Sequence, residues 1–470
     1  MSTSIDMGLA SMATADGSAV EGAHKPEMKK SCKHVLSSLF PQAVGVAGIK
    51  FIFNGKEFKI RRLLWGIALL GCLAVMSYQI VNRCVYFSKN PVNTLVEVKY
   101  VDQLAFPSVV ICNYNSYRKS YIEENEADFA TILKQFASDV MGNLDINDTL
   151  QEGSLKYTNL TELRLDSAHQ LDAIVNAHFD NEELTRENFS LAIFEFGVCY
   201  TFNLDNSHRL KVKTPGVSHG LKLILDVQQS DYYHNDRHSP LAAGFQLQAL
   251  DSQTNIPQVN EYGIAVGPGT MTLIGLTVHE THNLPPPHGK CGSKKLRYYD
   301  VYKTSLCRLE CQTAFVIKEC NCRAPHMPGP ERECNPLEIV CMNKAMEKFY
   351  TMSSATECSC PVPCDVVTYA TTVSQAKFPS EFYSEFLAES MSSKLNKSLD
   401  AADIRNDYCY INIFFNELSR QIQTQQEAYV FCSLLSDIGG SLGMWIGGSV
   451  LTVCEIIDII GYSLHKGRPN

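Results

Sequence analysis

Three carboxylates lie inside an apolar stretch near the end of the chain. Residues 429–464 are apolar enough to enter a bilayer, yet they include Asp437, Glu455 and Asp458. An acid at the bilayer centre costs roughly 3 kcal/mol on insertion scales, so it usually faces water or a partner. Asp437 and Glu455 are separated by about 27 Å of helix, at about 1.5 Å per residue, close to the roughly 30 Å of a hydrocarbon core. The acids therefore bracket the core.

Small residues lie between these acids. The triplet Gly447-Gly448-Ser449 could interrupt the helix and turn carbonyl oxygens toward a partly dehydrated cation. Irregular backbone at this depth is tolerated only where it lines water or is buried in protein. Gly439, Gly443 and Gly447 also form G-x-x-x-G steps, which alternatively indicate close packing against another membrane helix.

Glu455 and Asp458 are three residues apart and share one helical face. If several subunits surround one ion pore, these acids would form rings near its cytosolic mouth. The alternative is that they are solvated acids at the membrane interface without a role in permeation.

A second apolar window, residues 63–81, contains no charged residue and is predicted to be an uncleaved membrane anchor. Basic residues flank both windows on the side away from the intervening segment, which predicts cytosolic termini and an external middle. These residues are Lys50, Lys56, Lys59, Arg61, Arg62, Lys466 and Arg468. The first 25 residues are expected to be disordered.

Cysteine usage supports an external middle segment. Most of the 18 cysteines lie between the two windows, ten of them from Cys291 to Cys364, and such density is typical of disulfides in an oxidising compartment. Zinc is the alternative, but the one-residue spacing of Cys320 and Cys322 is unusual for structural zinc. The same segment holds four glycosylation sequons, at Asn147, Asn159, Asn188 and Asn396.

Composition excludes several function classes. The net charge of −9 argues against nucleic-acid binding, and the mean hydropathy of −0.10 fits few membrane spans. The chain has no nucleophile elbow, metalloprotease motif or P-loop. We expect no enzymatic activity, no catalytic residue, no cofactor and no bound metal.

The middle segment alternates between two patterns. Strands are predicted in "FPSVVICN", "FGVCYTFN", "GLKLILDVQQ", "AGFQLQAL" and "TMTLIGLTVHE". Amphipathic helices are predicted in "EADFATILKQFASDVMGNL" and "PSEFYSEFLAESMSSKL". The segment is therefore predicted to be one α+β domain with a disulfide-rich module at residues 290–365.

These residues resemble the degenerin/epithelial sodium channel family, most closely its acid-sensing branch. The resemblance rests on "FPSVVICN", "CYTFN", "LPPPHGKC", "YKTSLCRLECQTAFVIKECNCRAPHMPG", "CSCPVPC" and "LLSDIGGSLGMWIGGSVLTVCEIID". It implies a homotrimeric or heterotrimeric plasma-membrane channel, sodium-selective, voltage-insensitive and amiloride-sensitive, with a large external domain. The expected divisions are 1–62 (cytosolic, re-entrant near 45–50), 63–84 (first span), 85–430 (external), 431–461 (pore-lining span) and 462–470 (cytosolic).

The resemblance also implies disulfide pairs. One of the external cysteines, Cys409, is left over and is expected to be a free thiol in a strand or an unpredicted cross-link. The implied pairs are Cys112 with Cys199, Cys291 with Cys364, Cys307 with Cys360, Cys311 with Cys358, Cys320 with Cys341, and Cys322 with Cys334.

The family's pore positions map onto the C-terminal stretch. By resemblance, residues 447–449 are the selectivity filter, and Ser436, with Asp437 and Gly440, is the degenerin gate, where bulky substituents hold family channels open. Glu455 and Asp458 are the acids of the lower pore. Sodium is the expected permeant ion and calcium an expected blocker.

Departures from the family pattern concern gating. Gly48 matches the glycine of the family's re-entrant His-Gly motif, but Ala47 replaces the histidine. His288 replaces a tryptophan that packs against a tyrosine after the first span, here Tyr86. A His-Tyr contact there would be weaker or pH-sensitive.

The proton-sensing pocket of acid-sensing members is depleted. Asn343 and Glu347 occupy two aspartate positions, and too few carboxylates face them to raise one another's pKa. The sequence therefore leaves four gating modes as alternatives: protons, an extracellular peptide, bile acids, or constitutive activity. A further alternative is a non-conducting modulatory subunit or receptor. An ATP-gated trimer of P2X type would not carry the filter triplet.

Overall fold

The computed structural model describes residues 45–53, 58–125, 159–204, 209–234, 241–251, 262–351 and 358–466. The chain forms two compact units, one of residues 1–89 with 429–470 and one of residues 90–428. The sequon at Asn147 and the helix expected at residues 126–144 lie outside the described residues. Each unit is described by itself.

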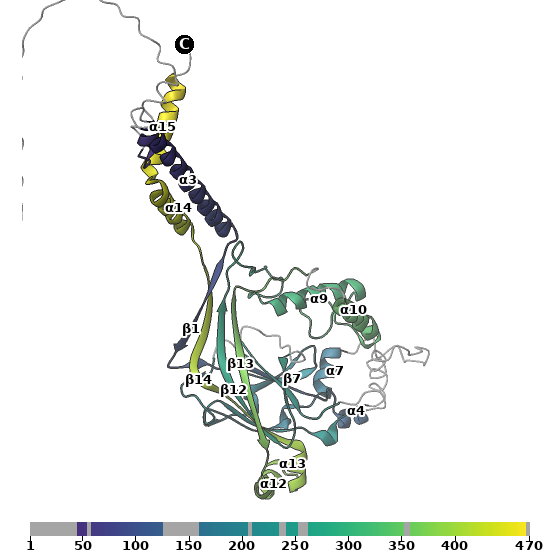
Figure 1. Cartoon of the computed structure of the whole chain (residues 1–470). Helices are drawn as coiled ribbons and strands as arrows, with labels where there is room; N and C mark the ends of the chain where they lie inside the picture. Colours follow the sequence, from purple (N-terminus) through teal and green to yellow (C-terminus); the bar gives the residue numbers. More distant parts are fainter. Residues whose placement is uncertain are drawn as a thin grey trace, which may run out of the picture. The chain divides into compact units, whose positions relative to one another are not determined.

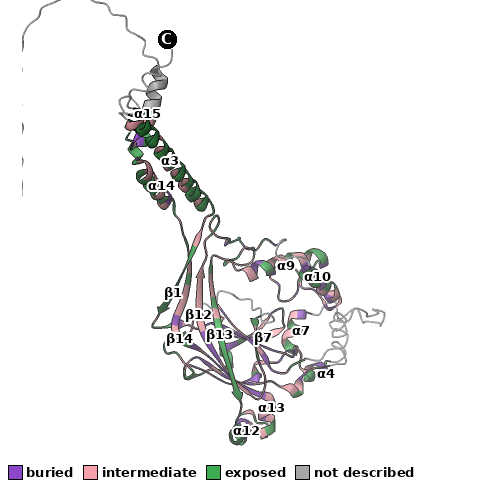
Figure 2. Cartoon of the chain, viewed as in Figure 1, coloured by how far each residue is buried: buried purple, intermediate pink, exposed green. Residues whose placement is uncertain are grey.

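The described part of the first unit is helical. They are α2 (Ile49–Phe53), α3 (Lys59–Ser88), α14 (Phe431–Ile446) and α15 (Val450–Lys466). α3 is long and apolar enough to cross a membrane, and α14 with the start of α15 passes the same test only as one span bent by 74°. α3 contains no buried residue (Figure 2), as expected of a helix that turns its side chains to lipid.

α14 packs against α3 (Figure 1). The Trp445 Nε1–H donates a hydrogen bond of 2.8 Å to Gln79 Oε1. In hydrocarbon a polar pair of this kind satisfies two groups that lipid cannot. The pair therefore fixes the register of α14 on α3.

A seven-stranded sheet forms the centre of the second unit. Its strands run in the order β13-β12-β14-β9-β4-β5, with β1 also paired to β14. β12 and β14 are parallel and the other neighbours are antiparallel. The strands are β1 (Val92–Tyr100), β4 (Ile174–Phe179), β5 (Glu182–Glu183), β9 (Leu221–Asp226), β12 (Thr270–His282), β13 (Asp365–Lys377) and β14 (Tyr408–Glu427).

A second sheet of five strands has the order β11-β10-β3-β7-β6. One hydrophobic core contains buried residues of both sheets. Phe106 lies at its centre, with ring centroids 5.0 Å from Phe179 and 5.9 Å from Phe415. The strands are β3 (Ser108–Asn113), β6 (Phe189–Ile193), β7 (Val198–Phe202), β10 (Phe245–Leu250) and β11 (Ile264–Val266), and a separate pair is β2 (Leu104–Ala105) with β8 (Lys211–Val212).

The five segments predicted as strands coincide with β3, β7, β9, β10 and β12, and β12 continues two residues beyond its predicted end. β9 buries every second residue, as the alternation of "LKLILD" predicts. The predicted helix in "PSEFYSEFLAESMSSKL" contains α12 (Glu381–Leu395). The described part of the unit also contains short helices: α4 (Lys119–Glu124), α7 (Leu160–Ser167), α13 (Ala401–Asp407), and the 3₁₀ turns η1 (Leu171–Ala173), η2 (Arg186–Asn188), η3 (Gln229–Asp231) and η4 (Pro336–Glu338).

The cysteine-rich module contains α9 (Thr304–Cys320) and α10 (Ile339–Thr351). The two helices share a small core of their own. Six disulfides join the same pairs that the family resemblance implies, namely Cys112–Cys199, Cys291–Cys364, Cys307–Cys360, Cys311–Cys358, Cys320–Cys341 and Cys322–Cys334. Cys409 is a buried free thiol in β14.

Candidate functional site

The second apolar stretch breaks at the predicted filter. α14 ends at Ile446, and Gly447 follows with a φ of 66°, which a residue with a Cβ adopts only with strain. The Gly448 N–H donates to the Leu442 carbonyl at 3.2 Å, and the Gly447 N–H to the Gly443 carbonyl at 3.1 Å. The bond from Gly447, together with its left-handed backbone, is that of an αL helix cap. The glycine at 447 is therefore required by the backbone as well as permitted by packing.

The chain resumes as α15 directly after Ser449. The Ser449 N–H donates to Thr452 Oγ1 at 3.1 Å, and the Thr452 N–H donates back to Ser449 Oγ at 3.4 Å. Such reciprocal bonds satisfy two amides that a new helix start leaves open. Ser449 therefore caps the start of α15, which explains a hydroxyl residue at the third position of the triplet.

Residues 45–47 contact both sides of this break. The Ala47 N–H donates to the Ile446 carbonyl at 2.9 Å, one of the acceptors that the end of α14 leaves free. The Gly45 N–H donates to Glu455 Oε2 in α15 at 3.2 Å. A Cβ added at Gly447 would lie 3.3 Å from the Ala47 Cβ. The expected re-entrant segment thus lies against the expected filter.

Gly48 explains how the chain turns beside the first span. Its φ is 83°, and an added Cβ would lie 2.8 Å from the Trp65 ring. The Phe51 ring stacks on Trp65 with centroids 5.1 Å apart, and Arg62 Nε donates to the Ile52 carbonyl at 2.8 Å. A glycine is therefore required at residue 48, both by the positive φ and by the lack of space for a Cβ beside Trp65. The Ala47 position contributes its backbone and a methyl group.

Asp437 lies in the N-terminal half of α14, and its carboxylate has two polar partners. The Tyr429 hydroxyl donates to Asp437 Oδ2 at 2.6 Å, and Arg83 Nε lies 3.4 Å from the same oxygen. Ser436 and Gly440, the other expected gate residues, are exposed in the single chain. The carboxylate that looked costly inside an apolar stretch is therefore compensated by an ion pair and a hydrogen bond.

The two lower acids differ in their surroundings. Both are exposed, but Glu455 accepts the hydrogen bond from the Gly45 N–H described above. They were expected to act together because they share a helical face. The structure gives Glu455 a partner in its own chain.

Tyr86 and His288, which were expected to contact each other, belong to different units. Tyr86 lies edge to face against Tyr429, with centroids 5.4 Å apart, in the first unit. His288 lies in the second, with Nε2 3.6 Å from Glu427 Oε1 at the end of β14. A direct contact between Tyr86 and His288 stays a prediction.

The expected sensor residues, Asn343 and Glu347, lie on α10, half-buried and exposed respectively. Residues 235–240, part of the segment expected to face them, lie outside the described residues. The assignment of Asn343 and Glu347 as sensor residues also stays a prediction.

Another acidic cavity lies where β9 and α13 meet the start of β14. It has a volume of about 460 Å³ and is lined by Asp226, Gln228, Ser230, Asp231, Lys397, Leu399, Asp403, Asp407 and Tyr408. Burial raises the pKa of the Asp226 carboxyl, and the charge of Asp407 raises it further, against a hydrogen bond from the Gln228 N–H. Sequence reasoning missed this cavity because its acids come from segments far apart in the chain.

His326 in the cysteine-rich module is held neutral. Burial lowers its pKa to about 3, and the positive charge of Arg164 acts in the same direction. Both ring nitrogens are buried without a hydrogen-bond partner among the described residues. This histidine therefore stays uncharged at any pH near neutrality.

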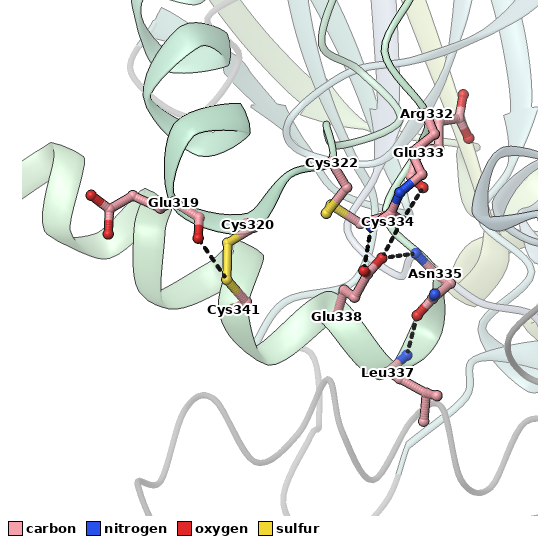
Figure 3. Close-up of polar contacts among 10 residues, drawn as sticks. All are labelled: Glu319, Cys320, Cys322, Arg332, Glu333, Cys334, Asn335, Leu337, Glu338 and Cys341. Carbon is pink, nitrogen blue, oxygen red and sulfur yellow. Dashed lines mark hydrogen bonds and ion pairs between the residues drawn. A yellow bond between two sulfur atoms is a disulfide. The ribbon is translucent and has the colours of Figure 1, made fainter. Parts of the chain in front are cut away.

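Figure 3 shows the group in this module that comes nearest to a metal site, formed by Cys322, Cys334 and Glu338. The two sulfurs are joined in a disulfide, so neither is the thiolate that zinc requires. Arg332 pairs with the Glu338 carboxylate through two contacts of 2.6 Å and, with a hydrogen bond from the Asn335 N–H, lowers the pKa of Glu338. The group is structural.

The predicted glycosylation sites within the described residues lie in the second unit. Asn159 caps α7, Asn188 ends η2, and Asn396 follows α12. Their oxygens cap local backbone at Asn159 and Asn188. Glycosylation of these side chains stays a prediction.

Comparison with known proteins gives a consistent answer. The family model "Amiloride-sensitive sodium channel" matches residues 40–459. Acid-sensing ion channel 4-B of Danio rerio is 31% identical over 88% of this chain and 73% of its own length. Acid-sensing ion channel 1 of Gallus gallus is 30% identical (91% and 84%), and acid-sensing ion channel 2 of Homo sapiens 29% (92% and 86%).

A solved proton-activated chloride channel aligns over 85% of this chain and 98% of its own, with a TM-score of 0.34 and 7% identity, too remote to carry an argument. The family match instead spans the whole second unit and residues 40–89 and 429–459 of the first, and so includes the break between α14 and α15 and the cysteine-rich module. The chain belongs to the amiloride-sensitive sodium channel family, a family of ion channels and not of enzymes.

Proposed function

We propose that this chain is a subunit of a sodium-selective, voltage-insensitive and amiloride-sensitive cation channel of the plasma membrane, opened by an extracellular ligand or by protons. Sodium would move down its gradient along the second spans. The subunits would form a homotrimer, or a heterotrimer with related subunits, around this path. Calcium would act as a blocker.

The observation that carries the proposal is the break in the second span at residues 447–449. A helix interrupted at membrane depth leaves backbone groups unsatisfied unless protein or water receives them. Here residues 45–47 support one side of the break, through the Ala47 to Ile446 hydrogen bond. The remaining carbonyl oxygens can line a water-filled path and coordinate a cation.

The proposed orientation places both termini in the cytosol and residues 90–428 outside. The disulfides support this, because such bonds persist in oxidising compartments. Assembly with other subunits is supported by the open faces of α14, where a Cβ added at Gly439 or Gly440 would meet nothing within 4 Å. Small residues of this kind allow close approach of another helix.

For the gating stimulus we propose several candidates. Relatives are named for acid sensing, but Asn343 carries no titratable group at one expected sensor position. The cavity around Asp226 gives a second place where acidification could act, because a carboxyl with a raised pKa is the first to be protonated as pH falls. A peptide-gated, bile-acid-type or constitutively active channel, or a non-conducting modulatory subunit, is the alternative.

Expression in oocytes tests the proposal. External pH, calcium and candidate peptides are stepped in turn while current and its block by amiloride are recorded. The variant Ser436→Phe serves as an open-state control, because a bulky residue at the gate position should hold the channel open. Amiloride-blocked current supports the proposal. Absence of current from surface-expressed Ser436→Phe under every condition contradicts an autonomous channel.

A further inference from the structure

We propose that the acidic cavity between β9, α13 and the start of β14 binds an organic cation that carries ammonium or guanidinium groups. Such a cation is either a free amine or the basic side chain of an extracellular peptide. The cavity, of about 460 Å³, has the size of a small-molecule site, which is about 300–1,000 Å³. Control of the channel by this binding rests on the proposed function, whereas the binding itself does not.

The negative charge of this cavity is not balanced by the chain. Four carboxylates and one ammonium line it, and all four acidic residues are half-buried. The acids are Asp226, Asp231, Asp403 and Asp407, and the ammonium belongs to Lys397. Among the described residues, none of the four acids forms an ion pair. Like charges that are partly removed from water repel one another, so they favour a bound cation.

Three other half-buried carboxylates of the second unit show the contrast. Each of them pairs with a basic side chain of the same unit. The pairs are Asp251 with Lys303 at 3.2 Å, Glu280 with Arg420 at 2.9 Å, and Glu333 with Arg323 at 3.2 Å. The described residues give the acids of the cavity no basic partner of this kind.

Backbone amides hold two of the cavity's carboxylates in place. Asp226 Oδ1 accepts a hydrogen bond of 2.8 Å from the Gln228 N–H, and Asp407 Oδ1 accepts one of 3.3 Å from the Gln229 N–H. Asp407 Oδ2 accepts no hydrogen bond from a described residue. The site is thus preorganised with an oxygen left for a ligand, which lowers the free-energy cost of binding.

The Tyr408 hydroxyl is an independent sign of a missing partner. The residue is 1% exposed, and among the described residues its hydroxyl oxygen has no hydrogen-bond partner of normal geometry. Burial, and then the charges of Asp226, Asp407 and Asp403, raise the pKa of this hydroxyl, so it points into the acid cluster. A buried polar group without a partner is costly, and an N–H of a bound ligand would supply one.

The spacing of the acids favours an organic cation over a metal ion. Ca²⁺ requires several oxygens at about 2.3–2.6 Å from its centre, so its ligand atoms must converge. Among the described residues, three ligand atoms of His, Cys, Asp or Glu lie within 4.8 Å of one another only at Cys322, Cys334 and Glu338, outside this cavity. An ammonium or guanidinium directs several N–H donors outward and can bridge carboxylates that lie further apart.

Calorimetric titration of the purified full chain tests the site with two probes. 1,4-Diaminobutane represents a free amine, and Nα-acetylarginine methylamide represents the arginine side chain of a peptide. We expect at least one of them to bind to the wild type with one site per chain. Binding of the diamine alone indicates a free amine as the ligand, and binding of the arginine derivative alone indicates a peptide.

Conservative substitutions locate the binding. Asp226→Asn and Asp407→Asn keep the oxygen that accepts a backbone N–H and remove the charge, so the fold should survive. Each should lower the affinity at least about fivefold, as loss of a charge-assisted hydrogen bond predicts. Tyr408→Phe should lower it about two- to fivefold. Asp102→Asn, which removes an exposed acid outside the cavity, is the matched control and should stay within about twofold of the wild type.

Failure of both probes to bind to the wild type overturns the inference. Equal affinity of the wild type, Asp226→Asn and Asp407→Asn also overturns it, as does calcium binding that depends on these two acids while neither probe binds. In oocytes, the probe that binds should change the amiloride-sensitive current of the wild type and have no effect on Asp226→Asn/Asp407→Asn. If the probe binds as expected but the chain carries no current under any condition, the proposed function fails and the cation site stands.

Discussion

At the residue scale, burial decides which side chains respond to pH. His326 is buried with both ring nitrogens unpartnered among the described residues and a pKa lowered to about 3. Asp226 is shifted in the opposite sense, with its pKa raised by burial.

His326 leads to a pH prediction for stability. Its folded-state pKa is lowered, so the unfolded chain binds the proton more readily, and stability should fall as pH falls from about 6.5 toward about 3. The loss should be a few kcal/mol, at most about 5. His326→Phe removes both nitrogens and should flatten this dependence. Thermal unfolding of the purified chain from pH 7.5 to pH 4 measures it, and identical pH profiles for both proteins contradict the burial argument.

At the element scale, the break between α14 and α15 is defined by backbone conformation more than by side chains. Gly447 ends one helix, and Ser449 begins the next by exchanging hydrogen bonds with Thr452. The two neighbouring glycines therefore differ. Gly447 has a φ of 66°, whereas Gly448 is not among the residues with positive φ.

This difference predicts unequal effects of adding one methyl group. Gly447→Ala should reduce sodium selectivity or abolish current, because the left-handed conformation costs about 1 kcal/mol with a Cβ and the methyl would lie 3.3 Å from the Ala47 Cβ. Gly448→Ala should be milder, since its methyl meets the Ile446 side chain at 3.4 Å. Current ratios under sodium and potassium, normalised to surface protein, give the comparison. Equal effects at both positions argue against the assigned geometry.

Much of this element could be predicted from sequence, and the reasons are local. The triplet at 447–449, the spacing of Asp437 from Glu455 and the apolar composition are all visible in one stretch. The partners were not visible. Arg83 and Gly45 lie hundreds of residues away in the chain, so no periodicity indicated that they meet Asp437 and Glu455. Likewise, the cavity around Asp226 combines residues of β9, η3 and α13, which only the folded topology brings together.

At the scale of the whole molecule, the second unit combines a large two-sheet core with a smaller module that contains five of the six disulfides. The cysteine-rich module has a limited core between α9 and α10, and most of its cysteine pairs connect α9 or its flanks to later segments. The strand alternation and the cysteine density predicted this division. The exact pairing came from resemblance, because spacing alone leaves many connectivities open.

We expect disulfide-bonded cysteines and the free Cys409 to contribute unequally to the stability of the fold. Replacing both Cys307 and Cys360 with serine should destabilise the module by about 2–5 kcal/mol, since the bond restricts the unfolded chain. Cys409→Ser, at a buried free thiol, should leave all six bonds intact. Unfolding of the purified chain, with disulfide mapping by mass spectrometry, tests both. Unchanged unfolding after loss of Cys307–Cys360 contradicts the proposed dependence.

The central claim concerns the ion that passes through the assembled channel, and the reversal potential measures it directly. In oocytes that express the full chain with Ser436→Phe, external sodium is replaced stepwise by potassium and then by a large organic cation. The account predicts an amiloride-sensitive current whose reversal potential moves by about 59 mV per tenfold change in external sodium, and shifts strongly negative in potassium. A reversal potential that is unchanged by sodium replacement, or that follows chloride, would contradict it.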